Sequence, residues 1–218
     1  MKRRLKGLGL AMLAVLAMGS VAAQGAQGAT PGLLTAEAYP ATLSGTQLNT
    51  HIFTLTGLGT AFECEVTKLS GSLASPGSST VTVTPTYEKC KWFGQSLTYD
   101  VEGCDFLIHI GETSGSNYSG TTDIVCPVGK VIKLTSGIVG NRCEIQIGPQ
   151  TGLGKVEGIN KAGPPKDVEL KLSLTGITYK VTKDEGVCAL SKVGETFKDG
   201  DYSGNVTLTG SSGLSISD

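Results

Sequence analysis

Apolar and polar residues alternate with a period of two along most of this 218-residue chain. Successive side chains on a β-strand point to opposite faces, so this pattern predicts strands with one buried and one exposed face. No segment after residue 23 keeps a helical period of 3.6 over three turns. The sequence therefore predicts an all-β protein, with its clearest strands at residues 50–56, 61–67, 97–101, 104–110, 143–147, 168–174 and 177–181.

Strands with one apolar face must bury that face against another apolar layer. An antiparallel β-sandwich does this with two stacked sheets, and two stacked β subdomains are the alternative. The composition suits many short strands joined by tight turns, because the chain has 31 glycines and only 17% charged residues. We therefore expect a β-sandwich.

The first 23 residues have the organisation of a secretory signal peptide. A basic segment at 2–6 precedes an apolar segment at 8–17, and Val21-Ala22-Ala23 forms a small-residue cleavage site. Spanning a membrane takes about 20 apolar residues, more than this segment offers. The expected organisation is a signal peptide at 1–23, a disordered leader at 24–40 and a β-sandwich domain at 41–218 of an extracellular protein.

The charge balance restricts the partners. The whole chain has 18 basic and 19 acidic residues. Removal of the four basic residues of the signal peptide leaves 14 basic and 19 acidic residues, a net charge of −5. Nucleic acids and anionic membrane surfaces require a basic face, so neither is an expected partner.

Six cysteines follow the signal peptide, which predicts disulfides in an exported protein. Three of them share a strand face with apolar neighbours, as Cys64 does with Phe62, so we expect structural sulfur atoms that point inward. Metal binding is disfavoured because no C-x-x-C pair is present and only two histidines are available. The six are Cys64, Cys90, Cys104, Cys126, Cys143 and Cys188.

Three disulfides can be connected in 15 ways. Pairing of neighbours would join Cys64 to Cys90, Cys104 to Cys126 and Cys143 to Cys188. The middle pair has a local argument, because the segments 104–110 and 121–126 flank a polar loop and a hairpin would bring their outer ends together. The other two pairings have no comparable support.

The sequence offers little for catalysis, and no catalytic residue or cofactor is predicted. His51 falls on the apolar face of its strand and His109 lies opposite the Cys104 face. No G-x-S-x-G nucleophile elbow is present. Two acid pairs on strands, Glu63 with Glu65 and Asp100 with Glu102, could serve a glycoside hydrolase, although alternating acids usually form the solvent face of a strand.

A calcium site is one specific hypothesis. Asp199, Asp201 and Ser203, followed by Gly204, resemble the opening of a calcium-binding loop. The twelfth position, where an EF-hand has a bidentate Glu, is Gly210. A turn leading into a strand is the competing interpretation.

Trp92 and Phe93 follow Cys90 directly and form a second hypothesis. Strand alternation cannot bury both neighbours on one face, so one ring is expected to be exposed in a loop held by a disulfide. Such a ring could stack on a sugar or anchor a protein partner. The alternative is that Trp92 packs at the edge of the core.

Several segments in a fixed order carry a resemblance that spans most of the chain after the signal peptide. They are FECEVTKLSGSL, VTVTPTYEKC, EGCDF, VCPVGKVIKL, CEIQIGPQTGLG, LTGITYKVT and GDYSGNVTLTG. In these segments, and most specifically in its cysteine order, the chain resembles a group of secreted, six-cysteine, β-rich proteins of soil actinobacteria with no known activity. The resemblance implies export and a six-cysteine β fold, and it supplies no site residue.

These observations together predict a secreted, non-catalytic protein. Its role would be structural, or it would bind a ligand such as cell-wall polysaccharide or protein at the cell envelope or in the medium. A secreted hydrolase that uses strand-borne carboxylates and a protease-inhibitor-like scaffold that presents a loop are the alternatives.

Overall fold

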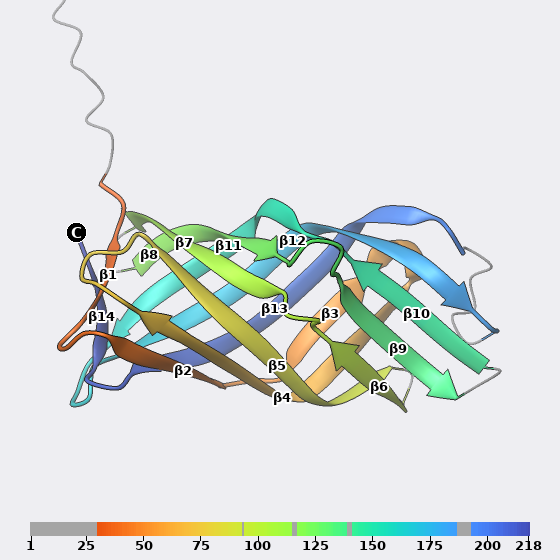
Figure 1. Ribbon diagram of the computed structural model, residues 1–218, viewed down its shortest axis with the longest axis horizontal. Coiled ribbons are helices and arrows are strands. Elements are labelled where there is room, and N and C mark those ends of the chain that lie inside the picture. Colours follow the sequence, from red (N-terminus) through yellow and green to blue (C-terminus); the bar gives the residue numbers. More distant parts are fainter. Residues whose placement is uncertain (1–29, 93, 115–116, 139–140, 187–192) are drawn as a thin grey trace, which may run out of the picture.

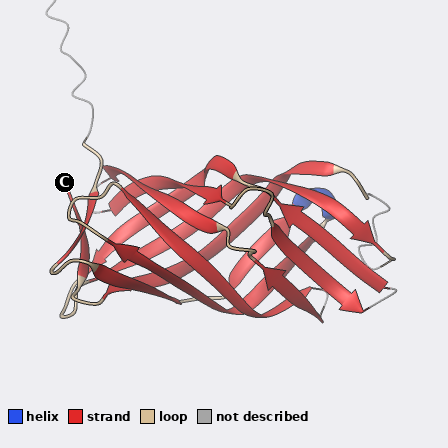
Figure 2. Ribbon diagram, in the orientation of Figure 1, coloured by secondary structure: helices blue, strands red, loops and turns tan. Residues whose placement is uncertain are grey.

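The computed structural model describes residues 30–92, 94–114, 117–138, 141–186 and 193–218. Within these ranges the chain forms strands and one short 3₁₀ helix (Figure 2), which confirms the predicted all-β class. The elements are β1 (Leu33–Ala36), β2 (Ala41–Gln47), β3 (His51–Leu55), η1 (Thr56–Leu58), β4 (Thr60–Leu73), β5 (Thr80–Trp92), β6 (Gln95–Asp100), β7 (Asp105–Ser114), β8 (Asn117–Val125), β9 (Ile132–Ile138), β10 (Asn141–Ile147), β11 (Gln150–Lys161), β12 (Asp167–Asp184), β13 (Thr196–Gly210) and β14 (Leu214–Ser217).

Twelve of the strands form one antiparallel sheet in the order β10-β9-β6-β5-β7-β8-β11-β12-β13-β2-β4-β3. Additional pairings of β4 with β5, β10 with β12 and β3 with β13 close this sheet on itself. The two apolar layers expected of a sandwich are therefore opposite walls of one continuous sheet. Closure pairs the strand edges that would otherwise be exposed.

The pairings form two closed circuits of eight strands each. One circuit runs β5-β7-β8-β11-β12-β13-β2-β4, and the other runs β5-β6-β9-β10-β12-β13-β3-β4. The four longest strands, β4, β5, β12 and β13, belong to both circuits and run obliquely to the long axis of the molecule (Figure 1). The two circuits thus share four strands and one hydrophobic core.

The alternation of buried and exposed side chains shifts by one residue in three of these long strands. In β4, Cys64 is buried, but Val66 is only half-buried and Thr67 is 1% exposed, so the strict alternation predicted for residues 61–67 ends after Cys64. In β5 the shift occurs at Lys89, whose φ is 54°, and in β12 at Gly176, whose φ is 73°. In β5 and β12 the residue in the left-handed region turns the side chains that follow it to the opposite face.

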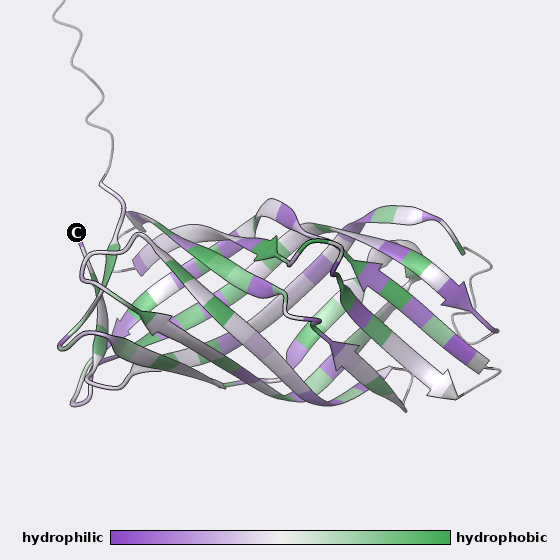
Figure 3. Cartoon of the chain, viewed as in Figure 1, coloured by the Kyte–Doolittle hydropathy of each residue, from purple (hydrophilic) through white to green (hydrophobic). Residues whose placement is uncertain are grey.

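A continuous hydrophobic core fills the space inside the closed sheet. Hydropathy alternates along the strands, as the period of two predicts (Figure 3). Leucine, isoleucine and valine dominate the first circuit. Aromatic residues gather in the second circuit and at the junction, where Tyr202 hydrogen-bonds to Tyr87 and makes edge-to-face ring contacts with both Tyr87 and Phe106.

Strands β1 and β14 form a separate two-stranded sheet at one end of the closed sheet (Figure 1). Leu34 is 1% exposed and Ile216 is 2% exposed, so this small sheet contributes to the core. The expectation of a disordered leader at 24–40 is therefore wrong for the part that the structure describes: residues 33–36 form a strand because Leu34 has an apolar site to occupy. Residues 24–29 lie outside the described residues.

Two of the predicted disulfides are present. Cys64 and Cys90 lie opposite each other on β4 and β5, with their Cα atoms 3.9 Å apart. Cys104 and Cys126 join the outer ends of the β7–β8 hairpin, with their Cα atoms 4.1 Å apart. Cys143 is buried and also in a disulfide, but Cys188 lies outside the described residues, so the third pairing stays a prediction.

Candidate functional site

Trp92 does not present its ring to solvent. The side chain is 2% exposed, packs edge to face against Phe62, and donates a hydrogen bond from Nε1 to Oγ1 of Thr60 over 2.8 Å. The hypothesis of an exposed binding ring at Trp92 is therefore wrong. Trp92 keeps the alternation of the second half of β5 and points inward, because burying an indole gives a large hydrophobic gain once its N–H has an acceptor. Phe93 lies outside the described residues.

The proposed calcium ligands lie on a strand and not in a loop. Asp199, Asp201 and Ser203 are alternate residues of β13, so each is separated from the next by about 7 Å along one face of the strand. Asp199 accepts a hydrogen bond from the Tyr179 hydroxyl over 3.0 Å. Extended backbone cannot bring these oxygens around one ion, and the described residues contain no group of three or more His, Cys, Asp or Glu side chains that could hold a metal.

The two histidines occupy separate environments. His51 is buried inside the closed sheet and hydrogen-bonds to Tyr202 and to the carbonyl oxygen of Asn205. His109 lies 2.9 Å from the Asp123 carboxylate. In the part of the chain that the structure describes, neither imidazole hydrogen-bonds to a serine, threonine or cysteine side chain, so the geometry brings no nucleophile to a histidine base.

One acid of each pair, Glu65 in the first and Glu102 in the second, has a lowered pKa. Glu65 accepts a hydrogen bond from Lys91, which lowers the pKa of the Glu65 carboxyl. Lys133 does the same for Glu102. The general acid of a glycoside hydrolase has a raised pKa, so neither Glu65 nor Glu102 has the electrostatic environment of such an acid.

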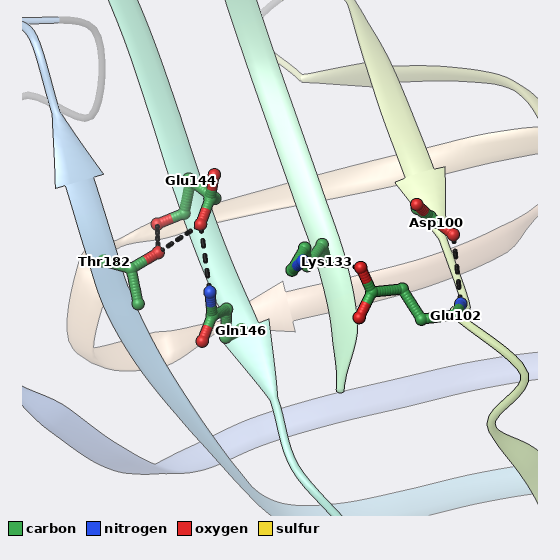
Figure 4. Close-up of polar contacts among 6 residues, drawn as sticks. All are labelled: Asp100, Glu102, Lys133, Glu144, Gln146 and Thr182. Carbon is green, nitrogen blue, oxygen red and sulfur yellow. Dashed lines mark hydrogen bonds and ion pairs between the residues drawn. The ribbon is translucent and has the colours of Figure 1, made fainter. Parts of the chain in front are cut away.

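Figure 4 shows the polar cluster around Lys133 on the outer face of β9, β10 and β12. Lys133 pairs with Glu102 and is also attracted by the carboxylates of Asp100 and Glu144. Glu144 accepts hydrogen bonds from Thr182 over 2.7 Å and from Gln146 over 3.0 Å. These contacts join neighbouring strands from outside, and each carboxylate in the cluster has a partner.

A different part of the outer face is rich in hydroxyl groups. It covers β13, β2, β4 and β5, which are consecutive neighbours in the closed sheet (Figure 1). The strand register places polar side chains, most of them with a hydroxyl group, side by side in rows across the four strands. One row is Thr209–Ser44–Ser70–Thr84, the next is Thr207–Thr46–Lys68–Thr86, and the third includes Thr42–Ser72. We call this surface the hydroxyl face.

The hydroxyl groups in these rows differ in their hydrogen bonding. Ser44 and Thr209 bond to each other over 2.7 Å, and Thr84 donates to Asp105 over 2.6 Å. The exposed hydroxyl groups of β4 and β5 have no hydrogen-bond partner among the described residues. They belong to Ser70, Ser72, Thr82 and Thr86.

A hollow of about 500 Å³ opens at one end of the hydroxyl face. It lies over the last residues of β4, the first residues of β5 and the turn between them. Six of its ten lining residues are Ser or Thr, and none is charged. The six are Ser72, Ser75, Ser78, Thr80, Thr82 and Thr84.

A second hollow of about 520 Å³ lies over the other halves of β4 and β5, beside the disulfide between Cys64 and Cys90. Its lining combines apolar Ile52 and Ala61 with charged Glu63 and Lys91. The Lys91 ammonium is held 2.5 Å from Glu65. This hollow is therefore chemically mixed, whereas the hydroxyl face has a single repeated group.

Part of the hydroxyl face has a signal in the sequence. The segment TVTVTPT places Thr80, Thr82, Thr84 and Thr86 on one face of a strand. The neighbouring rows come from residues 42–46, 68–72 and 207–209. Sequence reasoning missed them because only the register of distant strands sets them beside this segment.

Comparisons with models of known protein families, with curated proteins and with solved structures found no match for this chain. Among the described residues, no helix has the length and apolar character needed to cross a membrane.

Proposed function

We propose that this is a secreted, non-catalytic protein of the cell envelope or medium that binds a neutral polysaccharide through the hydroxyl face. The rows of partner-free serine and threonine hydroxyl groups on β4 and β5 carry the proposal. Disulfides persist in oxidising compartments, and the pairs Cys64–Cys90 and Cys104–Cys126 support export.

The hydroxyl group suits this ligand class because it donates one hydrogen bond and accepts two. A sugar hydroxyl has the same capacity, so matched groups can pair in either direction. Neighbouring rows on a strand lie about 7 Å apart and neighbouring strands about 5 Å apart, which gives a repeated set of contacts to an extended polymer. Each such bond contributes about 1 kcal/mol, so useful affinity requires several rows to engage together.

The electrostatics of this face favour an uncharged ligand. Lys68 is the one basic residue in the rows, and its ammonium pairs with Glu88 over 3.3 Å. The hollow at the end of the face is lined by uncharged residues. Binding should therefore change little between low and moderate salt, because salt screens interactions between exposed charges.

The test is retention of the wild-type protein by insoluble cellulose, chitin and cell-wall polysaccharide, followed by calorimetry with soluble oligosaccharides. A triple variant, Ser70→Ala, Thr82→Val and Thr86→Val, removes three partner-free hydroxyl groups from the face. The matched control is Thr98→Val, Ser173→Ala and Thr175→Val, which removes three exposed hydroxyl groups elsewhere.

We expect the face variant to lose retention on the polysaccharide that binds wild type and the control to keep it. Far-ultraviolet circular dichroism and melting temperature check that both variants fold. The proposal is wrong if wild type binds none of the polysaccharides, or if the folded face variant binds as tightly as wild type.

A further inference from the structure

His51 lies inside the closed sheet at the junction of the two circuits. The side chain is 2% exposed and comes from β3, a strand of five residues. Its Nδ1 atom is 2.5 Å from the hydroxyl oxygen of Tyr202, and its Nε2 atom is 3.3 Å from the carbonyl oxygen of Asn205. Both ring nitrogens therefore connect β3 to β13.

The hydrogen bonds around Tyr202 settle which nitrogen carries the proton. Tyr87 donates its hydroxyl hydrogen to the Tyr202 oxygen over 2.9 Å. The Tyr202 hydrogen is then available for Nδ1 of His51, which must accept it. Nδ1 as acceptor leaves the hydrogen of the neutral ring on Nε2, which donates to the Asn205 carbonyl.

Tyr99 extends this series to β6. Its hydroxyl group hydrogen-bonds to that of Tyr87, and the two ring centroids are 4.1 Å apart. Because Tyr87 gives its hydrogen to Tyr202, Tyr99 must be the donor in this bond. The result is a directional chain that passes from Tyr99 through Tyr87 and Tyr202 to His51 and ends at a backbone carbonyl. We call it the tyrosine chain.

Among the residues that the structure describes, no carboxylate faces the ring to compensate a positive charge. The titratable groups that face it are the phenol of Tyr202 on β13 and, beyond it, those of Tyr87 on β5 and Tyr99 on β6. On β4 the residue opposite His51 is Cys64, which is held in a disulfide, and its neighbours Glu63 and Glu65 lie on the outer face.

Burial is the main cause that lowers the pKa of His51, and the hydrogen bond to the Asn205 carbonyl opposes it only in part. The ring also has little room to move. A Cβ atom at Gly204 would lie 2.5 Å from Cγ and Nδ1 of His51, so the ring packs directly on the backbone of β13. A charged ring could not leave Tyr202 without separating from β13.

We propose that His51 is an acid-sensitive latch that holds β3 in the closed sheet. Protonation of Nδ1 turns the acceptor of the Tyr202 hydrogen into a donor. The tyrosine chain then has no acceptor at His51, and its hydrogen bonds must reverse direction. The latch secures a short element, since β3 pairs with β13 at only four positions and no cysteine of β3 ties it to another strand. Acid therefore releases β3 from β13 before the rest of the sheet opens.

The sign of the pH effect follows from the lowered pKa. The neutral ring is favoured in the closed state, so the stabilisation is complete above the ordinary histidine value of about 6.5 and falls as the pH decreases below it. One proton is taken up on opening. The equilibrium constant for opening of β3 should rise by up to about tenfold for each pH unit below about 6.5.

Amide hydrogen exchange on the wild-type protein, corrected for the intrinsic effect of pH, tests the release directly. Between pH 8 and pH 5 we expect the protection of the β3 amides to fall by up to about tenfold per unit below pH 6.5, while that of the paired segments of β11 and β12 stays constant. Equal changes in all strands, or no change in β3, would overturn the proposal.

Two variants assign the effect to one ring. His51→Gln keeps an amide that can donate and accept but cannot be protonated, so the pH dependence of β3 protection should disappear. His109→Gln is the matched control, because it removes the other histidine and should leave that dependence intact. If His51→Gln does not fold, the NMR resonance of the His51 imidazole in the wild-type protein is followed against pH instead. A titration near the ordinary histidine pKa while the β3 amides stay protected would contradict the latch.

Discussion

The Asn160 side chain hydrogen-bonds to Ile216 as a neighbouring strand would. Asn160 Nδ2 donates to the Ile216 carbonyl over 2.7 Å, and the Ile216 N–H donates to Asn160 Oδ1 over 2.8 Å. One amide side chain thus satisfies both backbone groups of Ile216. These two hydrogen bonds attach β14 to β11 of the closed sheet.

Replacement of Asn160 should loosen the small sheet. Asn160→Ala leaves both backbone groups of Ile216 without these partners, and we expect a loss of about 1–3 kcal/mol with faster amide exchange in β14. Asn160→Asp keeps the acceptor for the Ile216 N–H but sets a carboxylate oxygen against the Ile216 carbonyl oxygen, so it should also destabilise the small sheet. Unchanged exchange in β14 of the alanine variant would show that apolar packing alone holds the strand.

Gly204 leaves space for the His51 ring. A methyl group at Gly204 would overlap three ring atoms, and we expect Gly204→Ala to lower the free energy of unfolding by about 1–3 kcal/mol in urea denaturation. Gly148→Ala is the control, because a Cβ atom there has no neighbour within 4 Å. Similar effects of the two substitutions would contradict the close packing of His51 on β13.

Trp92 is the only tryptophan in the chain, so its fluorescence reports on one site. The buried indole should give a blue-shifted emission that soluble quenchers barely reduce in the native protein. Thr60→Val removes the hydroxyl acceptor of the indole N–H, and a loss of about 1 kcal/mol is expected. Red-shifted native emission with strong quenching by iodide would place the ring at the surface.

The disulfides at Cys64–Cys90 and Cys104–Cys126 should contribute similarly to stability. They join residues separated by 26 and 22 positions, and a loop-entropy treatment assigns about 3–4 kcal/mol to each. Replacement of either pair by alanine should lower the urea midpoint by comparable amounts. A much larger loss for one pair would indicate that its sulfur atoms also make essential packing contacts.

Asp123 should contribute to stability against acid. Burial raises the pKa of its carboxyl, but hydrogen bonds from the Gly152 N–H and from His109 outweigh this, so the pKa is lowered. This contribution is present above the ordinary aspartate pKa of about 3.9 and is lost as the pH falls through the lower folded value.

Thermal unfolding measured from pH 6 to pH 2 tests this contribution. Asp123→Asn should be less stable than wild type at pH 6, and the two melting temperatures should converge at the acid end. Asp201→Asn serves as the control, because no described residue hydrogen-bonds to the Asp201 carboxylate. A constant difference across the range would mean that the charge of Asp123 does not cause the effect.

Local information was enough to predict the β class and several of the strands. The period of two identified the inward side chains of most of them, including Ile145 and Leu170, because alternation is a property of extended backbone itself. The Cys104–Cys126 disulfide was also accessible, since a hairpin between close neighbours needs no distant partner. The sequence could not show the change of face near Val66, because a shift of one residue leaves the composition of the segment unchanged.

The sequence by itself therefore determined the β class, the faces of several strands and the disulfide of one hairpin. Tertiary structure decided which strands become neighbours, where the sheet closes and how the circuits join. The hydroxyl face and the contact between His51 and Tyr202 depend on those decisions, because they bring together residues more than 100 positions apart. Alternation fixes the face of a side chain, whereas its partners follow from the register of backbone hydrogen bonds between distant strands.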